Sequence, residues 1–143
     1  SGETPYWFVG QPQSMQWVGV MPARFGSGGR HAFRLALEAG ARGQDLVLRY
    51  QPWVPDGPFP DWANTEGRVL QTGVSGMGLR YLDDRAVAPT WQDAWTQVDY
   101  LPARVVLTLE EGGSAWPELV LDLRALPSTT GNRGGFTSVA GER

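Results

Sequence analysis

Apolar and polar residues alternate along most of the chain, and glycine or proline interrupts the alternation about every eight to twelve residues, as in short strands joined by turns. Within residues 32–38, the apolar residues Phe33, Leu35 and Leu37 occupy every second position, and Arg34 and Glu38 lie in the positions between and after them. A two-residue period places each set on its own face of a sheet. Similar apolar rows occur in residues 45–51, 103–110 and 117–124: Leu46, Leu48 and Tyr50; Val105, Leu107 and Leu109; and Leu119, Leu121 and Leu123. Residues 15–20, 67–72 and 78–83 fit further strands. The pattern predicts a mainly β protein with an antiparallel sheet that has one apolar face.

One segment has the pattern of a helix. Residues 88–95, "APTWQDAW", predict a helical turn or two with Thr90 as N-cap and Asp93 at the third position of a capping box. Trp91 and Trp95 would then lie on the same helical face, four residues apart.

The two ends of the sequence carry different signals. From residue 127 to 143 the periodicity is lost, so we expect a β domain at 1–126 and a flexible tail at 127–143. The sequence begins Ser-Gly-Glu without a methionine, which suggests a processed or truncated chain. No run approaches the roughly 20 apolar residues that span a membrane as a helix.

Composition narrows the function classes. With 143 residues, of which 41% are hydrophobic, the chain suits one domain with a real core. A net charge of −3 argues against nucleic-acid binding, which needs a basic excess. The absence of cysteine excludes disulfides, thiolate catalysis and cysteine metal sites.

The single histidine, His31, follows a glycine-rich stretch at 26–29. A phosphate-binding loop would lead into a helix, often with a lysine; these glycines lead into a predicted strand, and the chain has no lysine. We therefore expect a hairpin loop. One histidine without cysteine or a second histidine does not make a typical zinc site or a serine triad.

Two pairs of acidic residues are the remaining candidates for catalysis. Asp83 with Asp84 and Glu110 with Glu111 are adjacent in sequence, so their side chains point to opposite faces of a strand and do not flank a cleft. Each pair ends a predicted strand, where exposed acids are common, and the spacing of a calcium loop is missing after Asp83. We predict no catalytic, cofactor-binding or metal-binding residues and no enzymatic activity.

The chain has seven tryptophans, which allow two interpretations. Rows of aromatic residues on a β-sandwich can bind sugars, but large aromatic side chains also fill the core of a small sheet, as expected for Trp17 within a strand. The loop at 51–62 contains four prolines and should be extended and stiff. It is either a lip that binds a partner or a connection held in place by Trp53, Phe59 and Trp62.

Several segments together resemble a known family. In order they are Gly73–Val74, Leu79 to Asp83, Trp91, Trp95, Leu101–Pro102 and residues 103–110. Upstream, residues 8–22, "HAFRLALE" and "DLVLRYQPW" extend the likeness, so that it spans roughly residues 8 to 124. The sequence is similar to the GspJ family of minor pseudopilins of type II secretion systems, on structural positions and not on catalytic ones.

The resemblance implies a pilin-like protein with an N-terminal apolar helix followed by a β-rich periplasmic domain, anchored in the inner membrane of a Gram-negative bacterium. Such proteins join other minor pseudopilins at the pseudopilus tip and help to initiate assembly and protein export; the major pseudopilin and secreted substrates are further expected partners. The helix is absent from this sequence, so contact with a membrane is expected only through it. A minor pilin of a type IV pilus and a tryptophan-rich carbohydrate-binding β-sandwich are the alternatives.

The missing helix leads to one structural expectation. In the pilin plan, the helix covers the apolar row of the sheet. Without it, we expect the two ends of the sheet to curl together, or the row to be covered by the loops at 51–66, by the tail, or by another copy of the chain.

Overall fold

The protein is described here by a computed structural model covering residues 8–20, 29–54 and 60–121. These residues form nine strands and a single-turn 3-10 helix, so the predicted mainly β class is confirmed. The strands are β1 (Phe8–Gln11), β2 (Ser14–Val20), β3 (Arg30–Gly40), β4 (Gly43–Pro52), β5 (Glu66–Asp83), β6 (Thr90–Gln92), β7 (Arg104–Glu111), β8 (Ser114–Ala115) and β9 (Leu119–Leu121), and the 3-10 helix is Trp62–Asn64. No helix among the described residues has the length and apolar character needed to cross a membrane.

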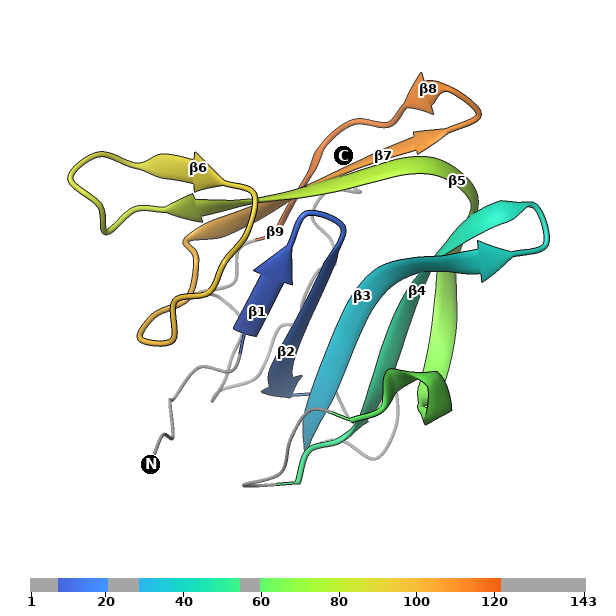
Figure 1. Cartoon of the computed structure of the whole chain (residues 1–143), viewed down its shortest axis with the longest axis horizontal. Coiled ribbons are helices and arrows are strands. Elements are labelled where there is room, and N and C mark those ends of the chain that lie inside the picture. Colours follow the sequence, from blue (N-terminus) through green and yellow to red (C-terminus); the bar gives the residue numbers. More distant parts are fainter. Residues whose placement is uncertain (1–7, 21–28, 55–59, 122–143) are drawn as a thin grey trace.

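All strands pair antiparallel in the order β1-β2-β3-β4-β5-β7-β8, with β6 beside β5 and β9 beside β7 (Figure 1). The segments predicted at 15–20, 32–38, 45–51 and 103–110 lie in β2, β3, β4 and β7. Of the segment predicted at 117–124, the part at 119–121 is β9, while 122–124 and the expected tail at 127–143 lie outside the described residues.

The two strands predicted at 67–72 and 78–83 are one strand, β5, which bends sharply in its middle (Figure 1). The register against β4 shifts between Leu46 and Val47 and again between Gln44 and Leu46, so β5 carries extra residues at these two places. Such bulges bend a strand and increase its twist. Gly73 lies at the bend with φ of +66°, in the region that favours glycine. The glycine-rich sequence therefore marks a bend and not the end of a strand.

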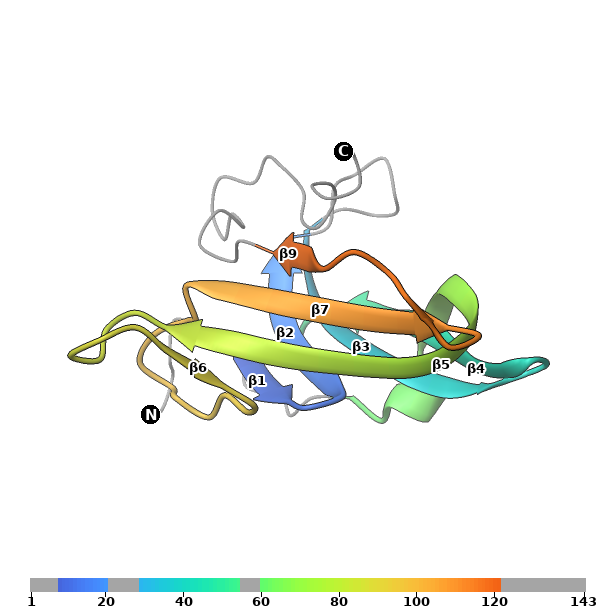
Figure 2. The ribbon, with the colours of Figure 1, turned by 90° about the horizontal axis from the view of Figure 1, so that it is seen from above.

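The bend divides the sheet into two layers. The first part of β5 pairs with β4 and the second part with β7, and Figure 2 shows β5 and β7 running across β1, β2 and β3. The open edge of β1 is then bonded to the segment before β7: the Gly10 N–H donates to the Trp95 carbonyl at 3.0 Å, and the Trp95 N–H donates to the Gly10 carbonyl at 2.9 Å. The Leu79 N–H of β5 donates to the Pro12 carbonyl at 2.8 Å. The sheet thus curls until its first strand meets its second layer.

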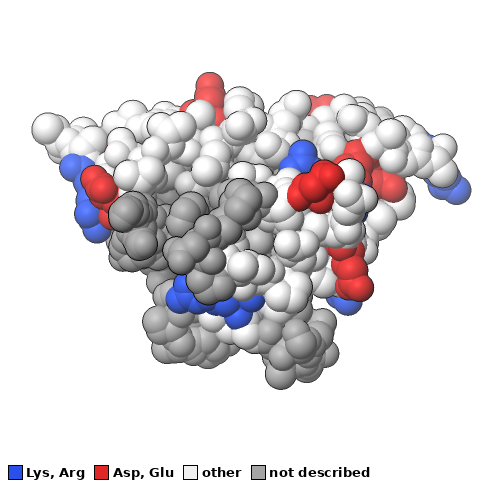
Figure 3. All heavy atoms as spheres, turned by 60° about the horizontal axis from the view of Figure 1, so that its bottom comes forward, with Lys and Arg blue, Asp and Glu red and all other residues white. Residues whose placement is uncertain are grey.

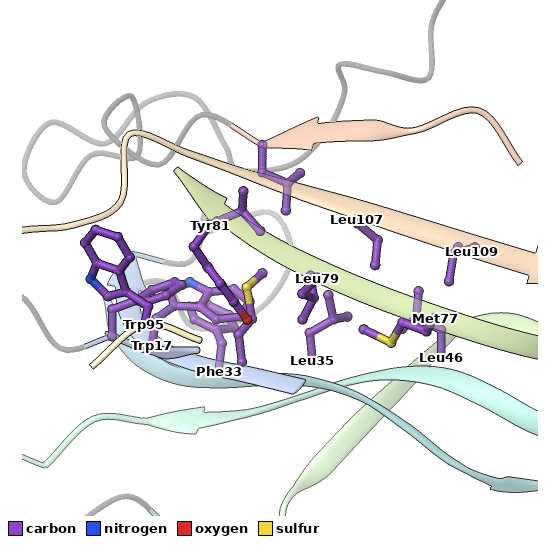
Figure 4. Packing of buried hydrophobic residues seen from close by; sticks show 14 of the residues in the cluster. Trp17, Phe33, Leu35, Leu46, Met77, Leu79, Tyr81, Trp95, Leu107 and Leu109 are labelled. Atoms are coloured by element: carbon purple, nitrogen blue, oxygen red, sulfur yellow. The ribbon is translucent and has the colours of Figure 1, made fainter. Parts of the chain in front are cut away.

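The core lies between these layers. Figure 4 shows side chains of β5 and β7, such as Leu79 and Leu107, facing those of β2, β3 and β4, such as Leu35 and Leu46. The described members of the predicted apolar rows therefore point inward, and Val105, the second residue of β7, is completely buried. Curling of the sheet, one of the coverings expected for these rows, is seen in the described residues. Among the described members of these rows, most are buried and the rest, Leu37, Leu48, Tyr50 and Leu119, are half-buried against the core.

Candidate functional site

The segment that connects β5 to β7, residues 84–103, is called the crossover and holds several of the residues singled out from the sequence. The predicted helix at 88–95 is wrong, because residues 90–92 form β6 and pair with Tyr81–Asp83 of β5. The Thr90 hydroxyl does not cap a helix; it donates to the Ala88 carbonyl at 2.9 Å. Pairing with β5 uses the backbone groups that a helix would have needed for its own hydrogen bonds.

Trp91 and Trp95 do not share a face and have opposite environments. Trp95 is completely buried, donates from its indole nitrogen to the Tyr100 carbonyl at 3.2 Å, and meets the Tyr100 ring edge to face at 5.5 Å. Trp91 is 42% exposed, and the Arg80 guanidinium lies 5.2 Å from the centre of its ring. Trp95 is therefore an anchor of the fold, whereas Trp91 belongs to the surface.

Asp84 is exposed, but the expectation that both acids are exposed is wrong for Asp83. Its side chain is buried, and its carboxylate accepts hydrogen bonds from the Tyr100 hydroxyl at 3.0 and 3.2 Å. It also accepts the Arg85 backbone N–H at 2.9 Å, which turns the chain after β5. The burial is tolerated because the carboxylate has these donors. Asp83 is thus a structural residue that ties the end of β5 to residue 100.

Tyr100 closes the same network. Desolvation, and then the hydrogen bond to the Asp83 carboxylate, raise the pKa of the Tyr100 hydroxyl above its ordinary value of 10.0. The Arg85 guanidinium lies 4.5 Å from the centre of the Tyr100 ring on the other side of the turn, a cation–π contact. The crossover is therefore held by Asp83, Arg85, Trp95 and Tyr100 together.

Sequence reasoning missed the residues that close the sheet. Tyr81 is completely buried, and its hydroxyl donates to the Gln11 carbonyl at 2.6 Å, with the Ser14 carbonyl at 3.3 Å. Burial raises the pKa of this hydroxyl. Its ring lies so close to Gly10 that a Cβ at that position would be 2.8 Å from the hydroxyl oxygen and closer still to ring carbons. The alternation of Leu79, Tyr81 and Asp83 signals an inward tyrosine, but no local pattern identifies its partner.

An ion-pair cluster covers the outer face of β3 and β4. Glu38 accepts two hydrogen bonds from Arg49, at 2.6 and 2.8 Å, and lies 3.7 Å from Arg34. The hydrogen bond from Arg49 holds the pKa of Glu38 below its ordinary value. On the face shown in Figure 3, acidic and basic side chains are interspersed among uncharged ones.

The single histidine and the second acidic pair lie at strand ends: His31 at the start of β3, and Glu110 and Glu111 at the end of β7. His31 is buried, with its Nδ1 3.1 Å from the Gly29 carbonyl. The strands on either side of the glycine-rich stretch pair antiparallel, Val20 with Arg30, while residues 21–28 lie outside the described residues. Glu110 and Glu111 are exposed, and Glu111 accepts the indole N–H of Trp116 at 3.2 Å. Within the described ranges, no group of three acidic or histidine side chains is placed to hold a metal ion.

The contacts of Trp17, Trp53 and Trp62 favour the interpretation that these tryptophans anchor the fold. Trp17 is buried and stacks on Phe33 with 5.3 Å between ring centres. Trp62 is half-buried and donates to the Gln16 side chain at 2.9 Å, while the backbone N–H of Trp53 donates to the Arg30 carbonyl at 3.0 Å. These contacts pin both ends of the predicted loop at 51–62. Phe59, the third expected anchor, lies outside the described residues, as do Pro55 and Pro58.

Comparison with known proteins gives one similarity that bears on function. The chain is 26% identical over 132 residues to the type II secretion system protein J of Xanthomonas campestris pv. campestris. The similarity covers 90% of this chain and 61% of the relative, so the chain spans less than two thirds of the relative's length. No protein-family model matches the sequence.

Proposed function

We propose that this chain is the β-rich domain of a component of a type II secretion system, equivalent to protein J. The observation that carries the proposal is the similarity to a secretion-system protein over 90% of this chain. The sequence resemblance to minor pseudopilins, over roughly residues 8 to 124, points in the same direction. The curled, mainly β architecture is compatible with a domain that acts by contact with other proteins.

In finer terms, we propose a minor pseudopilin that acts at the tip of the pseudopilus and helps to initiate its assembly. Its partners are then the other minor pseudopilins, with the major pseudopilin and exported proteins as further contacts. Residues 1–126 then contain the periplasmic domain. The full-length protein is anchored in the inner membrane by a helix that precedes the sequence given.

We propose a structural role and no catalysis. Two of the residues that the sequence offered for catalysis serve the fold: the Asp83 carboxylate holds Tyr100, and His31 contacts the backbone at Gly29. Both are buried and therefore poorly accessible to a substrate.

Deletion of the gene in its native host tests the proposal. Type II substrates should accumulate in the periplasm and return to the medium when the full-length gene is restored. Deletion of an unrelated periplasmic protein gene is the control. Unchanged export together with loss of surface pili would instead favour the minor pilin of a type IV pilus.

A glycan array with the purified chain tests the carbohydrate-binding alternative. Since Trp53 and Trp62 are half-buried, Trp91 is the tryptophan to mutate. Specific glycan binding that is lost in Trp91→Ala would support the sugar-binding module and contradict the assembly role.

A further inference from the structure

The first part of β5 is an open edge of the sheet. Among the described residues, 66–69 pair with β4 alone, whereas β7 pairs with β5 only from Val74 onward and β6 only from Tyr81. Figure 1 accordingly shows no described strand on the far side of this part of β5. Residues 66–70 are also all exposed. An edge strand presents N–H and C=O groups that can pair with one more extended segment.

The regular part of this edge is short and has a defined centre. It begins at Thr65, the residue before β5, whose backbone is already extended, with φ of −100° and ψ of 167°. It ends at Val69, because the register against β4 shifts there and leaves Leu70 as an extra residue opposite no residue of β4. A second strand can therefore follow the edge regularly over residues 65–69. The middle residue of this stretch is Gly67.

Two charged side chains on this stretch lack an opposite charge. Glu66 and Arg68 lie on the same face of β5, because they are two residues apart. Their register partners on β4 are Tyr50 and Leu48, which carry no charge. Neither Glu66 nor Arg68 forms an ion pair with another described residue.

Two other charged side chains near the edge are already bonded. Arg49 lies on the opposite face of the sheet, within the ion-pair cluster of β3 and β4. The Asp61 carboxylate caps the 3-10 helix before β5 and accepts a hydrogen bond from the Asn64 side chain at 2.9 Å. The regular stretch of the edge therefore offers one negative and one positive charge, Glu66 and Arg68, to another strand.

Symmetry restricts how two copies of this edge can pair. For antiparallel strands of identical chains, the two-fold axis is perpendicular to the sheet and passes between one residue and its own copy. An axis at Gly67 places Glu66 of each copy opposite Arg68 of the other. It also places Thr65 opposite Val69, so that all five regular residues are paired. Opposite charges in directly facing positions stabilise a strand pair.

Axes at the neighbouring residues are less favourable. An axis at Glu66 or at Arg68 brings like charges directly opposite each other, which destabilises a strand pair. An axis at Val69 runs into the extra residue Leu70 and leaves both charges without an opposite charge. An axis at Thr65 runs into the 3-10 helix. Charged residues on an open edge commonly prevent pairing, but this arrangement of charges favours one register.

We propose that two copies of this chain pair edge to edge through residues 65–69, around a two-fold axis at Gly67. Glu66 and Arg68 form two ion pairs across the axis, and Val69, which is 51% exposed in the single chain, is covered by the second copy. The proposal goes beyond the proposed function, because neither the resemblance nor the similarity to protein J assigns a contact between copies. One short strand pair buries little surface, so the dimer is weak.

Sedimentation equilibrium of the purified chain at roughly 0.01–1 mM tests the proposal, and we expect a reversible dimer. Glu66→Arg and Arg68→Glu should each raise the dissociation constant about tenfold, because each reversal places like charges opposite each other at two positions. Asp93→Arg and Arg42→Glu change the net charge equally at exposed positions away from this edge. These two controls should leave the dissociation constant unchanged.

Two combinations of the edge variants test the register. The double variant Glu66→Arg/Arg68→Glu exchanges the two charges and should restore the dimer. An equimolar mixture of the two single variants should also form a dimer, because one chain then presents two positive charges and the other two negative charges. In the wild-type protein, isotope-filtered NMR should detect contacts between the methyl groups of Thr65 and Val69 of different copies.

Several results would overturn the proposal: a chain that stays monomeric at about 1 mM, controls that weaken the dimer as much as the edge reversals, or no recovery in either combination. Slow exchange of the amides at 66–69 in a monomer would mean that another segment of the same chain occupies the edge, and would also overturn it. The substituted side chains are exposed, so the melting curves of all variants should match the wild type. The secretion role is tested separately, by the gene deletion.

Discussion

Replacement of Gly10 by alanine tests whether the sheet closes as the structure shows. A Cβ at Gly10 would lie 2.8 Å from the Tyr81 hydroxyl oxygen and nearer still to ring carbons. These distances are shorter than the contacts that Cβ atoms make with other atoms in real proteins. The ring cannot swing away, since it is completely buried and its hydroxyl is bonded to the Gln11 carbonyl at 2.6 Å. Strand β1 must therefore shift, which weakens the two hydrogen bonds between Gly10 and Trp95.

The expected cost follows from these contacts. Overpacking of a filled core costs about 1–3 kcal/mol, and each weakened hydrogen bond adds up to about 1 kcal/mol, so Gly10→Ala should lose about 2–4 kcal/mol of unfolding free energy. With a urea dependence of about 2 kcal/mol per molar, the midpoint should fall by about 1–2 M. Urea titration followed by tryptophan fluorescence measures this shift.

Two further variants decide whether the cost arises at Tyr81. In Gly19→Ala the new Cβ meets its nearest atom at 3.5 Å, an ordinary contact, so this variant should be neutral or slightly stabilising. In the Tyr81→Leu background the ring is gone, and the added cost of Gly10→Ala should largely disappear. A Gly10→Ala protein within about 0.5 kcal/mol of wild type, or a cost that is unchanged in the Tyr81→Leu background, would refute the reasoning.

Three more outcomes are expected. Trp95→Ala should lower the unfolding free energy by about 3–5 kcal/mol in urea titration, and Trp91→Ala by no more than about 1 kcal/mol; equal costs would contradict their assigned environments. The hydrogen bond from Arg49 lowers the pKa of Glu38. The stabilisation that ionised Glu38 provides is therefore present above the ordinary pKa of 4.5 and is lost as pH falls through the lowered pKa. The Glu38→Gln variant should therefore lose less unfolding free energy than the wild type below about pH 4.5. An identical pH dependence of the unfolding free energy in the two proteins would contradict this. Far-UV circular dichroism of the purified chain should show less helix than the roughly one third of an average globular protein.

The strands were predictable because each depends on a local pattern. In β3, β4 and β7 the two-residue period places Leu35, Leu46 and Leu107 inside, and the structure buries all three. The union of two predicted strands into β5 was not predictable, since glycines that permit a bulge also mark the end of a strand.

The errors at the crossover arise from contacts between distant residues. The helical pattern at 88–95 gave way to pairing with β5, and Asp83 is buried because of a tyrosine 17 positions away. The Tyr81 hydroxyl meets a carbonyl 70 positions earlier in the sequence. No single-sequence pattern specifies such pairs, so these contacts could be found only once the curl of the sheet was known.

The closure of the sheet is tested most directly by NMR couplings across hydrogen bonds in the purified chain. The account predicts couplings from the Gly10 amide to the Trp95 carbonyl, from the Trp95 amide to the Gly10 carbonyl, and from the Leu79 amide to the Pro12 carbonyl. These three amides should also exchange slowly with solvent. Fast exchange at all three, without the couplings, would mean that the sheet is open and that its apolar rows await a covering helix.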